Sequence, residues 1–153
     1  MKGYENKELC KKCGGRCCKG MPAPALPEDF DDADPETLKK AIDTGKWAID
    51  YLDLIGLAEP TEETESKAYY IRPKVKGNAE LVDTAKTGIC IFWSSKGCKL
   101  PFDERPAGCR YLEPKEDGPC LQHGPNVKHA AMAWIPHGWL IEKIINENSR
   151  VLD

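Results

Sequence analysis

The clearest hydrophobic periodicity of the chain lies between residues 34 and 56. Apolar side chains recur there at steps of three, four or seven, which predicts an amphipathic helix. Asp34 is suited to cap its first turn, with Pro35 at the first helical position. We expect one helix that ends by Gly56, or two helices broken near Gly45. The recurring apolar positions are Leu38, Ala41, Ile42, Ala48, Ile49, Leu52 and Ile55.

Two more helices are expected near the end of the chain. Asn126 is suited to cap a helix over residues 127–134, which a proline two residues later should interrupt. A further helix over residues 137–149 carries its apolar residues on one face. We expect both tryptophans of this region, Trp134 and Trp139, in the core. The apolar face consists of Leu140, Ile141, Ile144 and Ile145.

Short strands are predicted in the middle of the chain. Residues 68–72 read as a strand that stops at Pro73, which is typical of an edge strand. Residues 89–93 are a second candidate, followed by a turn over residues 94–97. Residues 98–124 show no periodicity and are expected to form a loop. These patterns indicate a small, irregular α+β domain with a few helices and short strands.

The composition fits one folded domain over residues 1–153. Charged side chains make up 31% and hydrophobic ones 41%, which is ordinary for a globular protein. The net charge of −3 gives no electrostatic reason to bind nucleic acid. The chain has neither a secretory signal nor an apolar run long enough to cross a membrane. We therefore expect a cytoplasmic protein that does not bind membranes.

Charge is distributed unevenly along the chain. Residues 1–20 carry six basic side chains against two acidic ones, whereas residues 28–36 carry six acidic side chains and no basic one. The simplest interpretation of both runs is solvated surface. The alternative for the basic run is that it offsets the negative charge of clustered cysteine thiolates.

Cysteine spacing is the strongest chemical signal in the sequence. The chain has eight cysteines in two blocks, and thiolates are preferred ligands of zinc, Cu(I) and iron–sulfur clusters. A Cys-x-x-Cys pair in the first block lets one turn direct two sulfurs at the same metal. A disulfide framework is not expected in a reducing compartment, and a thioredoxin-like motif would not need two further cysteines at once. The first block is Cys10, Cys13, Cys17 and Cys18, and the second is Cys90, Cys98, Cys109 and Cys120.

Two arginines flank Cys109 in the segment Arg-Pro-Ala-Gly-Cys-Arg, at Arg105 and Arg110. Their guanidiniums are suited to donate hydrogen bonds to cluster sulfides, thiolates or a bound anion. We therefore take Arg105 and Arg110 as candidate cofactor-binding residues. The alternative for each arginine is a surface salt bridge.

The three histidines are weaker candidates. His123 follows Cys120 by three residues, a spacing that allows both side chains to bind one metal. The simpler alternative for His123 is an exposed loop residue. His129 and His137 have no such partner, and we expect them on helix surfaces.

Together these motifs resemble the YkgJ-type cysteine-cluster family of zinc- or iron-chelating domains. The family pattern is Cys-x-x-Cys-x-x-Cys-Cys, then two downstream cysteines, then Arg-Pro-x-x-Cys-Arg. The present chain has one more residue before its cysteine doublet and a longer interval between Cys98 and Arg105. The resemblance spans residues 10–120 and implies metal binding without a defined activity. The matching positions are Cys10, Cys13, Cys17, Cys18, Cys90, Cys98, Arg105, Pro106, Cys109 and Arg110.

We therefore expect an irregular domain whose middle part folds around cysteine-ligated metal. An iron–sulfur cluster such as [4Fe–4S] is favoured over zinc, because the cysteines are scattered, interleaved with arginine and include an adjacent pair. The alternatives are a zinc-binding module that contacts a protein partner and a metal-cluster-dependent enzyme of unknown substrate. The sequence favours neither an enzymatic nor a non-enzymatic role.

Overall fold

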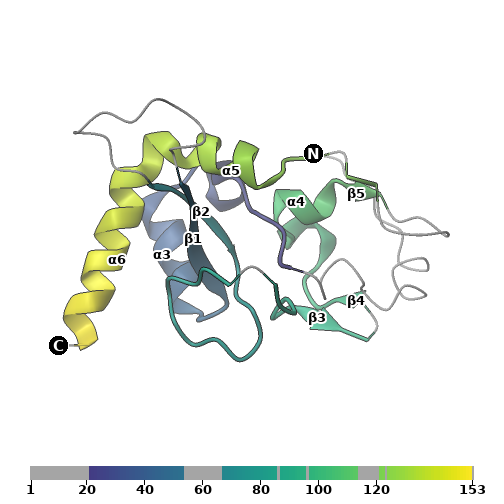
Figure 1. Ribbon diagram of the computed structural model, residues 1–153, viewed down its shortest axis with the longest axis horizontal. Coiled ribbons are helices and arrows are strands. Elements are labelled where there is room, and N and C mark those ends of the chain that lie inside the picture. The colour runs from purple at the N-terminus through teal and green to yellow at the C-terminus, as the bar shows by residue number, and fades with distance from the viewer. Residues whose placement is uncertain are drawn as a thin grey trace.

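Figure 1 shows a computed structural model of the chain, in which helices pack against a short antiparallel sheet. This arrangement confirms the expected small α+β fold. No helix among the described residues is long and apolar enough to cross a membrane. The first cysteine block, Cys120 and His123 lie outside the residues that the structure describes. The described residues are 21–53, 67–85, 87–95, 97–113, 121–122 and 124–152.

A 3-10 helix, η1 (Pro27–Phe30), is followed by a run of left-handed backbone. Asp31, Asp32 and Ala33 have φ angles of 55°, 55° and 59°, although none of them is glycine. This conformation costs an L-residue about 1–2 kcal/mol. The backbone N–H of Ala33 donates to the carbonyl of Pro27 at 2.9 Å, and this hydrogen bond holds the run in place.

Helix α3 (Pro35–Asp43) begins where the sequence predicts but ends earlier. The Asp34 carboxylate caps it by accepting a hydrogen bond from the backbone N–H of Thr37 at 3.0 Å. Gly45 has a φ of 76°, the left-handed conformation in which many helices end. The predicted helical continuation beyond Gly45 is wrong, because residues 47–53 form a strand.

Strand β1 (Trp47–Asp53) pairs antiparallel with β2 (Lys67–Pro73). The strand predicted over residues 68–72 is thereby confirmed. Both faces of β1 are buried, so apolar residues occur at neighbouring positions such as Ala48 and Ile49 and do not alternate. This is why the period of the segment resembled that of a helix. On the other side of β1, Val82 forms a parallel bridge with Ile49.

The C-terminal helices follow the prediction closely. The Asn126 side chain accepts a hydrogen bond from the backbone N–H of His129 at 2.9 Å and caps the first of them. Pro136 lies in a short 3-10 turn that separates the two helices. The expected apolar face is confirmed, since Leu140, Ile141 and Ile144 are buried. These elements are α5 (Val127–Trp134), η4 (Ile135–His137) and α6 (Gly138–Leu152).

Aromatic side chains fill much of the core. The fully buried Trp134 donates its indole N–H to the carbonyl of Ala25 at 2.9 Å, as a buried tryptophan requires. Phe30 meets the edge of Trp47 with ring centroids 5.0 Å apart. Ala25 in turn donates its backbone N–H to the carbonyl of Ile71 at 2.9 Å, so the segment before η1 runs along the edge of β2. The core placement predicted for Trp134 is therefore confirmed.

Trp139 does not lie in the core, contrary to the prediction. It is 62% exposed. An α-helix turns by about 100° per residue, so the inward positions of α6 place residue 139 on the opposite face. His129 is exposed and His137 is partly exposed beside the Trp134 ring, which agrees with the helix-surface positions predicted for them.

The middle of the chain contains more secondary structure than the sequence predicts. The strand expected over residues 89–93 is present only in part. Cys90 makes an isolated bridge to Val75, and Trp93 belongs to the short strand that follows. The expected turn over residues 94–97 is confirmed by a hairpin. The expected loop over residues 98–124 is wrong in part, since elements of two to four residues are too short to show a period. They are β3 (Trp93–Ser94), β4 (Gly97–Cys98), η3 (Phe102–Glu104), α4 (Ala107–Arg110), β5 (Leu112–Glu113) and β6 (Leu121–Gln122).

Candidate functional site

Three of the eight cysteines lie among the described residues. Cys90 is buried, whereas Cys98 and Cys109 are partly exposed. The Cys90 carbonyl accepts a hydrogen bond from the backbone of Trp93, which pairs with Cys98 across the hairpin. Within the described part of the chain, no group of three or more His, Cys, Asp or Glu side chains is placed to hold a metal ion. A metal centre therefore needs ligands from outside these residues.

The segment that carries Cys109 packs tightly against the residues before η1. Gly108 donates its backbone N–H to the carbonyl of Pro24 at 3.0 Å. A Cβ atom at position 108 would lie 2.9 Å from the Cβ of Ala23 and from the Pro24 oxygen, which is closer than real contacts allow. Only glycine permits this approach of the two backbones. The glycine before Cys109 is thus explained by packing.

Asp29 fastens the same segment through its carboxylate. Its Oδ2 accepts hydrogen bonds from the backbone N–H groups of Leu26 and Ala107, both at 2.9 Å. Its Oδ1 pairs with the Arg110 guanidinium at 2.7 Å, and the two side chains are only 7% and 11% exposed. The solvated-surface interpretation of residues 28–36 is therefore wrong for Asp29. For Arg110, the ion pair foreseen as the alternative is present, although it is largely buried.

Arg105 has different partners. Its Nε donates to the carbonyl of Leu100 at 3.1 Å, and its guanidinium carbon lies 5.5 Å from the centre of the Phe102 ring. The Arg105 carbonyl also accepts a hydrogen bond from the Arg110 guanidinium. The two arginines thus link the β3–β4 hairpin, α4 and the residues before α3 into one unit. Figure 1 shows α4 and the β3–β4 hairpin at the opposite end of the molecule from α6.

A second polar group, which was not predicted from the sequence, is formed by residues of β1, β2 and the segment after β2. Arg72 is fully buried, and its Nε pairs with Asp50 Oδ2 at 3.2 Å. Its Nη2 donates to the Asp83 carbonyl at 2.7 Å and lies 3.2 Å from Asp83 Oδ2, an ion pair without hydrogen-bond geometry. The Tyr70 hydroxyl donates to Asp50 Oδ2 at 2.9 Å. We call these four residues the buried ionic cluster. Its signal in the sequence is an arginine inside an otherwise apolar strand.

The surroundings of Tyr70 and Asp83 shift the pKa of each side chain. Burial and the adjacent Asp50 carboxylate raise the pKa of Tyr70 well above its usual range, so its hydroxyl remains a donor at neutral pH. Burial alone would raise the pKa of Asp83. A hydrogen bond from the backbone N–H of Ala85 and the Arg72 charge outweigh it and hold that pKa below its usual value. Asp83 is therefore charged at neutral pH.

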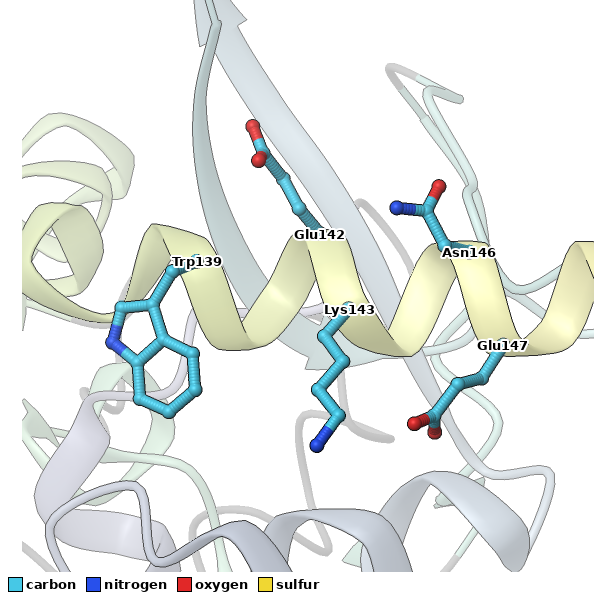
Figure 2. Close-up of a pocket in the computed structure, with 5 residues that line it drawn as sticks. All are labelled: Trp139, Glu142, Lys143, Asn146 and Glu147. Carbon is cyan, nitrogen blue, oxygen red and sulfur yellow. The ribbon is translucent and has the colours of Figure 1, made fainter.

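A shallow groove of about 330 Å³ follows the exposed face of α6. Figure 2 shows that Trp139, Lys143 and Glu147 project to the same side of the helix, as their spacing of four residues requires. Glu142 and Asn146 project from its other side. The groove brings together no buried polar group and none of the described cysteines, so it offers no chemistry comparable to that of the two sites above.

Comparison of the chain with models of known protein families, with curated proteins and with solved structures finds no match.

Proposed function

We propose that the protein is a cytoplasmic metal-binding protein that holds an iron–sulfur cluster through its cysteines, with a structural or redox role. The observation that carries this proposal is the docking of α4 onto residues 23–29, which follow the first cysteine block directly. The Arg-Pro-Ala-Gly-Cys-Arg segment is the part of the chain that most resembles the YkgJ-type family. Its tight packing supports a well-defined geometry around Cys109 rather than a loose loop.

The short length of chain between Cys18 and Pro24 supports a metal centre shared by the two cysteine blocks. Pro24, which accepts a hydrogen bond from Gly108, follows Cys18 by six residues. Six residues span at most about 20 Å, so Cys18 cannot lie far from the backbone next to Cys109. Cys17 is limited in nearly the same way. This reach is compatible with a metal centre to which Cys17, Cys18 and Cys109 all contribute.

The remaining cysteines of the second block adjoin the same unit. Cys98 ends the β3–β4 hairpin, which Arg105 ties to α4 through the Leu100 carbonyl. Cys120 directly precedes β6, which pairs with β5 just after α4. Among the described residues, the segments that carry Cys98 and Cys109 and the strand that follows Cys120 therefore lie at or next to α4 along the chain. The ligand pool that we propose is Cys10, Cys13, Cys17, Cys18, Cys90, Cys98, Cys109 and Cys120.

The weak core of this end of the molecule also favours a bound metal. Between residues 87 and 113, only Cys90, Phe92 and Ala107 are among the buried hydrophobic residues of the described chain. A region with so little buried apolar surface usually needs a further source of stability, and cysteine-ligated metal supplies one. An iron–sulfur cluster fits four thiolates drawn from scattered segments.

A zinc-binding module that contacts a protein partner is the second candidate. Zinc also takes four cysteines, and it would stabilise the same end of the molecule without redox chemistry. The two arginines favour the cluster, since guanidiniums stabilise an anionic sulfide core. If the metal is zinc, the two arginines serve only to hold segments together through Asp29 and Leu100.

The test is purification without oxygen, followed by iron, zinc and sulfide analysis and a visible absorbance spectrum. We expect coloured protein with about four irons and four sulfides per cluster. Colourless protein with stoichiometric zinc and no sulfide would show that the zinc alternative is correct. Protein with neither metal, from cells supplied with both, would exclude both candidates.

Ligand variants sharpen the test. Cys13→Ser and Cys109→Ser are each expected to lower metal content and solubility together, because metal binding and folding are coupled in such sites. His129→Ala is the matched control, since this histidine is exposed on α5 and is not proposed as a ligand. Unchanged metal content in either cysteine variant would remove that residue from the ligand pool.

A further inference from the structure

The structure contains a cleft that the metal proposal does not use. It has a volume of about 590 Å³ and is open on one side to solvent. This volume lies in the range of pockets that hold small organic molecules. The cleft is formed by the ends of β1 and β2, the segment before η1, the turn after Asp83 and the start of α5. Its lining residues are Met21, Pro22, Asp50, Tyr51, Leu52, Tyr70, Thr84, Ala85 and Val127.

The buried ionic cluster meets this cleft at Asp50 and Tyr70. Only 10% of the Asp50 side chain is exposed. Its Oδ2 accepts hydrogen bonds from the Tyr70 hydroxyl and from Arg72, whereas its Oδ1 accepts one, from the backbone N–H of Tyr51 at 2.7 Å. A carboxylate can accept about four hydrogen bonds. Asp50 Oδ1 therefore retains capacity for one more donor.

The charge of the cluster favours a cation at that position. One guanidinium, Arg72, is shared between two carboxylates, Asp50 and Asp83, so one negative charge is left over. Among the described residues, neither nearby lysine pairs with these carboxylates: the Lys74 ammonium donates to the carbonyl of Ala79, and the Lys67 ammonium lies over the Tyr51 ring, 4.7 Å from its centre. A partly buried negative charge attracts a cation more strongly than an exposed one does.

The other walls of the cleft are largely apolar. Leu52, Val127 and the Met21–Pro22 segment surround the polar floor. Such a mixture of one charged acceptor and apolar walls is typical of sites that bind a small ligand by its polar end.

We propose that this cleft binds a small organic amine, whose ammonium group donates a hydrogen bond to Asp50 Oδ1 and whose apolar body lies against Leu52 and Val127. This site is independent of the proposed metal centre. Asp50 Oδ1 accepts a hydrogen bond from any donor, but only an ammonium donor also neutralises the excess negative charge of the cluster. An uncharged alcohol of the same size would fill the cleft without neutralising the cluster.

The experiment uses the full-length protein as purified, with 2-phenylethylamine as the probe and 2-phenylethanol as the uncharged match. Binding is followed by amide chemical shifts in NMR titrations, up to about 10 mM ligand, since ligands of this size bind weakly. We expect shifts at Tyr51, Ala85 and Val127 with the amine, and at least about tenfold weaker binding of the alcohol. Equal binding of both compounds, or no shifts at these residues, would overturn the proposal.

Two variants and a control complete the test. Asp50→Asn keeps the oxygen that accepts from Tyr70 and removes the charge, so we expect amine affinity to fall at least about tenfold. Leu52→Trp should block the cleft without touching the buried ionic cluster, which keeps the test decisive if Asp50→Asn folds poorly. Met132→Trp, at an exposed position of α5 outside the cleft, should bind the amine normally. Unchanged affinity in a folded Leu52→Trp variant would show that the amine binds elsewhere.

Discussion

The two ends of the molecule are stabilised by different interactions. The sheet region, formed by β1, β2, α3, α5 and α6, contains most of the buried apolar side chains and the buried ionic cluster. The cysteine region, residues 87–113, has few buried apolar side chains and is fastened by Asp29, Arg110 and the close approach of Gly108 to Pro24. Apolar burial stabilises the first region, whereas polar contacts at a few positions orient the second.

This difference indicates where the chain is sensitive to substitution. In the sheet region, many neighbouring side chains can compensate for the loss of one apolar contact. A buried charge that loses its partner has no such compensation. In the cysteine region, one carboxylate serves several donors, so a single residue controls the position of a whole segment. The following predictions test this comparison.

The largest effect is expected from Arg72→Met. The substitution leaves the Asp50 and Asp83 carboxylates buried without their cation, which should lower the free energy of unfolding by about 3–5 kcal/mol. Urea denaturation followed by circular dichroism measures it. Lys39→Met, at an exposed position of α3, is the control and should change stability little. A loss below about 1 kcal/mol for Arg72→Met would show that water reaches the buried ionic cluster.

A smaller and more local effect is expected from Asp29→Ala. The variant removes the carboxylate that pairs with Arg110 and the acceptor of the Ala107 backbone N–H, at a cost of about 2–3 kcal/mol. Hydrogen exchange should rise in α4 before it rises in β1 and β2. Glu28→Ala, an exposed neighbour, is the control. Equal acceleration of exchange in the sheet and in α4 would contradict the division into two regions.

The smallest effect, a stabilising one, is expected from Asp32→Gly. Glycine relieves the left-handed strain at φ 55° but adds freedom to the unfolded chain, so the net gain should be about 0.5–1 kcal/mol. Thermal unfolding measures it. Asp32→Ala removes the same carboxylate and keeps the strain, so it should not be stabilising. A gain in both variants would point to charge repulsion within the acidic run instead.

The same comparison explains which parts of the fold could be predicted. The caps at Asp34 and Asn126, the strand around Ile71 and the buried face of α6 follow from local rules, and all were predicted correctly. β1 was mistaken for a helix because burial on both faces removes the alternation that reveals a strand. The contacts of Asp29 could not be foreseen, since they join residues 78 positions apart along the chain.

The cysteine site stays a prediction in its chemistry, and its geometry could not be read from the sequence. The sequence singles out the motif around Cys109, and the structure adds that its glycine packs closely against another backbone. The sequence does not reveal that Pro24 is the partner. Nor does it reveal that Asp50, Tyr70, Arg72 and Asp83 meet, because their proximity depends on strand register and on a loop that folds back over the sheet.

One of the connections between the two ends of the molecule is the peptide group between Pro24 and Ala25. Its carbonyl, from Pro24, accepts the N–H of Gly108, and its N–H, from Ala25, donates to the carbonyl of Ile71. Because a peptide group is planar and rigid, its two hydrogen bonds constrain the orientation of α4 relative to β2. Both bonds use main-chain atoms alone. The relative alignment of the two ends can therefore persist while most surrounding side chains diverge, provided that position 108 stays glycine and position 25 does not become proline.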